Sequence, residues 1–173
     1  MDAANRKDLI LDATDRLLAR YGYQKMTIDD VAQEAGIGKG TVYLHFSSKQ
    51  EVVLSHVDRI VDRVLERCAA ILEQENSAEE KLREILILRV LFRFDSVQHY
   101  TESLAEVLRQ LRLPLLERRK GYFEAEARIV AKVLHEGQRT GAFRVVPASP
   151  TARAMILATN SLLPFSLSTR ELG

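Results

Sequence analysis

The chain has 173 residues and a formal net charge of +1, with 46% hydrophobic and 28% charged residues, which is typical of a globular protein. No apolar run reaches the roughly 18 residues of a membrane-spanning helix, and the first residues lack a secretory signal, so we expect a cytoplasmic protein. The single Cys68 excludes an internal disulfide, and the four histidines lack metal-ligand spacing, so we expect no metal and no cofactor.

Residues 5–21 are predicted to form the first helix. Apolar side chains recur there at helical spacing, and Gly22 ends the pattern. The apolar stripe consists of Leu9, Ile10, Ala13, Leu17, Leu18 and Tyr21. Two short helices follow, and this stripe gives them a core that they are too short to form alone.

Residues 27–46 read as a helix, a tight turn and a second helix. Thr27 is a suitable N-cap, and Asp29 and Asp30 follow where negative charge stabilises a helix N-terminus. Gly36 suits the left-handed position after the helix, and Ile37 is the apolar residue that often accompanies such a cap. The second helix is predicted over residues 39–46.

A helical wheel divides this second helix into two sides, since each residue turns the direction by about 100°. Val42 and Phe46 point toward the first helix of the pair. The residues that point away are Gly40, Thr41 and Leu44, with Tyr43 and His45 on the flanks. No acidic residue occurs between Ala35 and Gln50, whereas Lys39 and Lys49 are basic. The outward side therefore suits a polyanion, although Lys39 lies within about 40° of the buried side and has to snorkel outward.

Longer helices are predicted after this pair. Ser48 and Glu51 form a capping box that opens a helix of about 25 residues to Glu73, long enough to contact both halves of the molecule. A helix over residues 78–94 is apolar nearly all round and is expected to be buried. Arg89 and Arg93 interrupt it, which suggests a functional role, but outward snorkelling of their side chains explains them equally well. Residues 95–96 are predicted to interrupt the chain before a shorter helix to about residue 112.

The last part of the chain is predicted to hold two further helices. Pro114 suits the first turn of a helix to about Arg139, and residues 141–150 are predicted to be a loop. Ser149 and Pro150 then read as N-cap and first residue of a final helix. The residues expected on one side of it are Ala154, Met155, Ala158, Leu162 and Leu163.

The sequence TIDDVAQEAGIGKGTVYLHF followed by SSKQEV resembles the DNA-binding half of the tetracycline-repressor-like (TetR) family, and residues 5–56 match that pattern nearly throughout. The resemblance implies that the second helix of the pair enters the major groove of DNA. It implies that DNA is contacted by Gly38, Lys39, Gly40, Thr41, Tyr43, Leu44 and His45, with Thr27 and Lys49 on phosphates.

The resemblance also implies an all-α fold: an N-terminal three-helix helix-turn-helix domain over residues 1–47, joined by a long helix to a helical ligand-binding and dimerisation domain over residues 48–173. It implies a homodimer on a pseudo-palindromic operator and a small-molecule effector, most often in a repressor. Family members usually carry one more helix, so this helix lies beyond Gly173 or the dimer contact is built differently. Candidate effector-binding residues are Phe92, His99, Tyr100, Tyr122 and Phe123, and candidate dimer residues are Met155 and Leu162.

Other interpretations of the sequence are a nucleotide-binding loop, a catalytic site and a protein-interaction module. A nucleotide-binding Walker loop requires Gly and Ser or Thr where Gln33 and Gly40 stand, and a dinucleotide fingerprint requires a preceding strand. No grouping of acidic, Ser and His residues suggests catalysis, so we do not expect an enzyme. The competing hypothesis is a helical interaction module whose helix pair packs on another protein.

Overall fold

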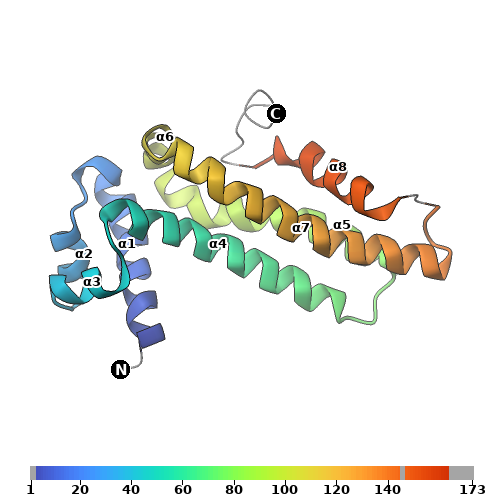
Figure 1. The fold of residues 1–173 in the computed structure, drawn as a ribbon, viewed down its shortest axis with the longest axis horizontal. Coiled ribbons are helices and arrows are strands. Elements are labelled where there is room, and N and C mark those ends of the chain that lie inside the picture. The colour runs from blue at the N-terminus through green and yellow to red at the C-terminus, as the bar shows by residue number, and fades with distance from the viewer. Residues whose placement is uncertain (1–2, 145–146, 164–173) are drawn as a thin grey trace. The chain divides into compact units, whose positions relative to one another are not determined.

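The protein is described by a computed structural model covering residues 3–144 and 147–163. For residues 3, 101 and 102 it describes only the backbone. Within the described residues it is helical throughout, as predicted (Figure 1). The helices are α1 (Ala3–Lys25), α2 (Ile28–Glu34), α3 (Lys39–His45), α4 (Lys49–Leu72), α5 (Ala78–Val97), the short 3₁₀ helix η1 (Gln98–Tyr100), α6 (Thr101–Gln110), α7 (Arg112–Thr140) and α8 (Ala148–Asn160). No helix in the described part is long and apolar enough to cross a bilayer.

The helices form two compact units. Unit 1 consists of the described residues of 1–60 and 97–115, and unit 2 of those of 61–96 and 116–173. Unit 1 includes the first half of α4 together with η1 and α6. The division into a DNA-binding domain over residues 1–47 and a second domain over residues 48–173 stays a prediction.

The core of unit 1 is built on α1, and α2 packs on both α1 and α3 (Figure 1). Ile10, Ala13 and Leu18 are at most 1% exposed, as their helical spacing predicted. Gly22 interrupts the helical backbone with φ 73° and ψ 172°, a region that side chains rarely adopt. The prediction for Tyr21 was wrong, since this ring is 47% exposed at the end of the stripe.

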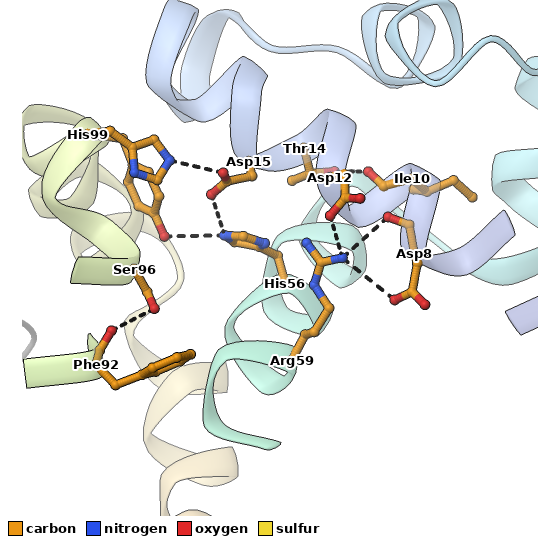
Figure 2. Close-up of polar contacts among 11 residues, drawn as sticks. Asp8, Ile10, Asp12, Thr14, Asp15, His56, Arg59, Phe92, Ser96 and His99 are labelled. Atoms are coloured by element: carbon orange, nitrogen blue, oxygen red, sulfur yellow. Dashed lines mark hydrogen bonds and ion pairs between the residues drawn. The ribbon is translucent and has the colours of Figure 1, made fainter. Parts of the chain in front are cut away.

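A partly buried polar network ties α1 to α4 and η1. Figure 2 shows the Asp15 carboxylate between two imidazoles: Oδ1 is 3.2 Å from His56 Nε2, and Oδ2 is 3.0 Å from His99 Nε2. The same His56 nitrogen is 3.2 Å from the Tyr100 hydroxyl. Burial alone raises the pKa of the Asp15 carboxyl, but the two histidines outweigh it and lower that pKa below its ordinary value. The negative charge of Asp15 thus helps to fix the position of α1.

The core of unit 2 is formed by the second half of α4 together with α5, α7 and α8. It includes Val64, Ile85, Val130, Leu134 and Ile156, each at most 2% exposed. Cys68 is buried among them as a small apolar side chain, as expected.

Helix α5 differs from its prediction in two ways. It continues through Asp95 and Ser96 to Val97, because the Ser96 hydroxyl donates to the Phe92 carbonyl at 2.7 Å and the residue stays within the helix. The helix is also not buried all round. Its exposed side carries Ile87, Leu91 and Phe94. Arg89 and Arg93 do not snorkel outward, because each is only 2% exposed.

Helix α8 begins earlier than predicted, at Ala148 with Pro147 as N-cap, so Pro150 lies in its first turn, where a missing N–H costs no helical hydrogen bond. Its buried side is Ala148, Ala152, Ile156 and Asn160. The side predicted to be apolar is therefore largely the outer one, because Ala154, Ala158 and Leu162 are exposed.

Candidate nucleic-acid interface

The two helices of the predicted motif are α2 and α3, and α2 begins at a capping box. The Thr27 hydroxyl accepts from the Asp30 N–H at 3.1 Å, and the Thr27 N–H donates to Asp30 Oδ2 at 2.8 Å. The Thr27 hydroxyl also donates to that carboxylate at 2.7 Å. These bonds lower the pKa of the Asp30 carboxyl. The hydroxyl proton of Thr27 is thus engaged by a carboxylate, and phosphate binding by Thr27 stays a prediction.

A tight turn connects α2 to α3. Gly36 has φ 67°, its N–H donates to the Gln33 carbonyl at 3.1 Å, and the Ile37 N–H donates to the Ala32 carbonyl at 3.0 Å. This pair of bonds is the Schellman arrangement, which needs a left-handed residue after the helix. Gly36 therefore fixes the direction in which α3 starts.

Helix α3 separates its residues as the helical wheel predicted. Val42 and Phe46 are 0% and 3% exposed, respectively. On the outer side Leu44 is 82% and Tyr43 48% exposed. Large apolar side chains in water are unfavourable on a free surface, but they suit contact with the methyl groups and edges of bases.

The other predicted DNA-contacting residues also lie at or near the surface. Gly38, Lys39 and Gly40 are exposed, and Thr41 and His45 are partly buried. A side-chain carbon added at Gly40 would meet nothing within 4 Å, so the packing of the protein itself does not require glycine in this helix. Because glycine weakens a helix, its presence favours close approach of something outside the chain.

Lys39 reaches solvent, as its prediction required. Its ammonium lies 2.8 Å from Asp29 Oδ2, and both side chains are exposed. The hydrogen bond to Asp29 raises the pKa of Lys39, so the lysine stays charged. A weak surface ion pair of this kind exchanges readily for a phosphate.

Lys49 is held differently. Its ammonium donates to the carbonyls of Tyr23 at 2.7 Å, Met26 at 2.9 Å and Gln24 at 3.3 Å, and lies 4.4 Å from the centre of the Tyr23 ring. Burial lowers the pKa of this lysine. Lys49 thus fastens the start of α4 to the end of α1, and a phosphate contact from it stays a prediction.

The five predicted effector-binding residues are divided between the two units. Phe92 and Phe123 pack against the core of unit 2. Tyr122 also belongs to unit 2. His99 and Tyr100 belong to unit 1, where His99 contacts Asp15 and Tyr100 contacts His56. Among the described residues, no three His, Cys, Asp or Glu side chains are grouped as metal ligands. The binding of an effector by these five residues stays a prediction.

Sequence reasoning missed a cluster of ionised residues in unit 2. Arg89 and Arg93 both bind the carboxylate of Glu126 from α7, and all three are at most 5% exposed. The available signal was the pair of arginines, four residues apart in an apolar helix, but periodicity alone does not reveal a partner 33 or 37 residues away.

Comparison with known proteins agrees with this geometry. Residues 10–55 match the family model described as "Bacterial regulatory proteins, tetR family". The fatty acid metabolism regulator protein of Bacillus subtilis is 26% identical over 151 residues, which cover 87% of this chain and 77% of the relative. The transcriptional repressor KstR2 of Mycolicibacterium smegmatis is 27% identical over 145 residues, covering 82% and 69% of the two chains.

Solved structures show the same fold. A TetR transcription regulator from Haloarcula marismortui is 20% identical with a TM-score of 0.74, and the match covers 91% of this chain and 84% of that one. The regulator FadR from Bacillus subtilis, solved in complex with stearoyl-CoA, is 24% identical with a TM-score of 0.67, covering 87% and 81%.

Proposed function

This chain belongs to the TetR family of DNA-binding transcriptional regulators, and we propose that it represses transcription by inserting the exposed side of α3 into the major groove of an operator. The observation that carries the proposal is the outer surface of α3. Tyr43 and Leu44 are exposed there beside Gly40, in a stretch from Ala35 to Gln50 without an acidic residue.

In this proposal the residues of α3 contact different parts of the DNA. Tyr43 and Leu44 contact base edges, and Lys39 leaves Asp29 for a phosphate. Gly38 and Gly40 allow the helix to approach the DNA backbone closely. Thr41, His45, Thr27 and Lys49 complete the proposed surface.

We further propose that two copies bind a pseudo-palindromic operator, since two-fold symmetric proteins match repeated half-sites. The outer side of α8 supports this, because Leu157 and Leu162 are 46% and 57% exposed there in addition to Ala154 and Ala158. Met155 packs against the core of unit 2, so we expect it to contribute less to the dimer contact than Leu162.

A small molecule releases such a dimer from DNA only if it binds more tightly to the conformation that does not fit the operator. The named relatives regulate fatty acid metabolism or repress transcription, and the solved FadR complex holds stearoyl-CoA. We propose that unit 2 of this chain likewise binds an effector.

The test is selection of bound duplexes from a random pool, followed by anisotropy titrations at several salt concentrations. We expect an inverted repeat, and an affinity that falls with salt by a slope of about −0.9 per neutralised phosphate. Tyr43→Ala is expected to weaken binding about tenfold or more. Tyr21→Ala is the matched control, because Tyr21 is 47% and Tyr43 48% exposed in the same unit.

The proposal fails if the folded protein binds no duplex at low salt, or if the two tyrosine variants lose affinity equally. Loss of a protein partner instead of DNA in the Tyr43 variant would point to the interaction module.

A further inference from the structure

Unit 2 buries a cluster of ionised groups between α5, α7 and α8. The Arg89 guanidinium binds Glu126 Oε2 at 2.7 Å and donates to the Thr159 hydroxyl at 2.7 Å. Arg93 binds the other oxygen of Glu126 and donates to the Arg89 carbonyl at 2.7 Å. Two guanidinium groups therefore share one carboxylate.

A third arginine adds a further positive charge to the cluster. Arg119 lies seven residues before Glu126 on α7, which places the two on the same side of that helix two turns apart. Burial lowers the pKa of Arg119, Glu126 raises it, and the charges of Arg89 and Arg93 lower it again. Arginine stays protonated even so. Three arginines and one glutamate thus interact electrostatically in this part of unit 2.

Several buried donors of unit 2 lack acceptors. The Arg119 Nη1 and Nη2 atoms and the Asn160 Nδ2 atom are buried, and each is without a hydrogen-bond partner. These are the unsatisfied buried side-chain atoms found in the described part of unit 2, and all three are donors. Buried donors without acceptors are unfavourable, as are positive charges that outnumber their countercharges, and an anion would relieve both.

Apolar and aromatic side chains surround these charges. Tyr122 and Phe123 follow Arg119 by three and four residues, so helical spacing places them on the side of α7 that runs toward Glu126. Phe123 and Phe92 pack against the core. The cavity beside Arg89 and Glu126 has a volume of only about 10 Å³, the space of one water molecule. A larger ligand therefore has to displace side chains as it enters, as a molecule that shifts a conformational equilibrium does.

We propose that Arg119, together with Arg89 and Arg93, binds the oxyanion of an effector whose remaining part is an aliphatic chain. The inference rests on the proposed function, because it assigns the chemistry of the effector that unit 2 binds. Arg119 supplies a planar fork that can hold a carboxylate or phosphate through two hydrogen bonds, while Glu126 keeps Arg89 and Arg93 in place.

The experiment measures binding to the full chain without DNA, by calorimetry and thermal shift. The probes are decanoate, decanoyl-CoA, decanol and inorganic phosphate. Decanoate carries its oxyanion on the chain, decanoyl-CoA carries it on the nucleotide, decanol has none, and phosphate has no chain. We expect decanoate or decanoyl-CoA to bind at least tenfold more tightly than decanol and phosphate.

The deciding variant is Arg119→Met, with Arg128→Met, an exposed arginine of the same helix, as its control. We expect Arg119→Met to weaken binding of the anionic probe at least tenfold, while its melting temperature without probe stays the same or rises, because buried donors without acceptors have been removed. Arg128→Met should bind like the natural protein.

Four results would overturn the inference: equal binding of decanol and the anionic probes, full binding by Arg119→Met, binding of phosphate alone, or binding of none of the probes. Failure of the proposed function is recognised separately, because the natural protein would then bind no operator DNA.

Discussion

Helices α3 and α5 place their charged and apolar side chains in opposite ways. In α3, Val42 is fully buried while Lys39 is exposed. In α5 the arginines Arg89 and Arg93 are buried, whereas Leu91 is 55% exposed. The difference shows that an arginine enters a core when a carboxylate from another helix meets it there, and that without such a partner the hydrophobic effect decides.

The largest effect is expected when that partner is removed. Glu126→Gln leaves Arg89 and Arg93 buried without a countercharge, and should lower the free energy of unfolding by about 3–5 kcal/mol. Urea denaturation measures this change. The control is Glu34→Gln, because Glu34 pairs with Arg16 at 2.6 Å on the surface of unit 1. An exposed pair contributes at most about 1 kcal/mol. Equal losses in both variants would mean that burial does not set the strength of these pairs.

A smaller effect is expected at Asp15, which is partly buried between His56 and His99. Asp15→Asn should cost about 1–3 kcal/mol at pH 7, since charged hydrogen bonds are lost. The folded state lowers the pKa of the Asp15 carboxyl below 3.8. Its contribution is therefore fully present above the unfolded pKa and is lost as the pH falls through the still lower folded pKa.

Urea midpoints of the natural protein and of Asp15→Asn between pH 7 and pH 3 measure this dependence. The gap between them should still be present at about pH 4 and should narrow below it. Asp12→Asn on the same helix, at a side chain that is 51% exposed beside Arg59, should cost less throughout. A gap that does not narrow in acid would contradict the role of the Asp15 charge.

The smallest change in stability is expected at Gly40. Unlike the two substitutions above, this one should stabilise the protein. Gly40→Ala should stabilise unit 1 by up to about 1 kcal/mol, because alanine favours the helix and its methyl group meets nothing within 4 Å. The same methyl group should weaken operator binding about tenfold, because it occupies space that DNA needs. Thermal denaturation and anisotropy measure the two effects.

Gly121→Ala on α7 is the matched control, since that position is also open. It should stabilise the protein similarly and leave operator binding unchanged. If Gly40→Ala binds the operator normally, α3 does not approach DNA closely at that residue.

The local features of this protein follow from its amino-acid sequence alone. The capping box at Thr27, the left-handed Gly36 and the inward direction of Val42 and Phe46 depend on neighbouring residues and on helical spacing, and the structure has all of them. The match of the helix pair to a known family rests on the same local pattern.

Only the tertiary structure decided which side of an apolar helix is buried and which charges meet. Spacing could not show that Lys49 fastens to carbonyls of α1, that Asp15 lies between two histidines, or that Glu126 draws Arg89 into the core. Each of these contacts joins residues at least 25 positions apart, and burying a charge is favourable only where the fold delivers its partner.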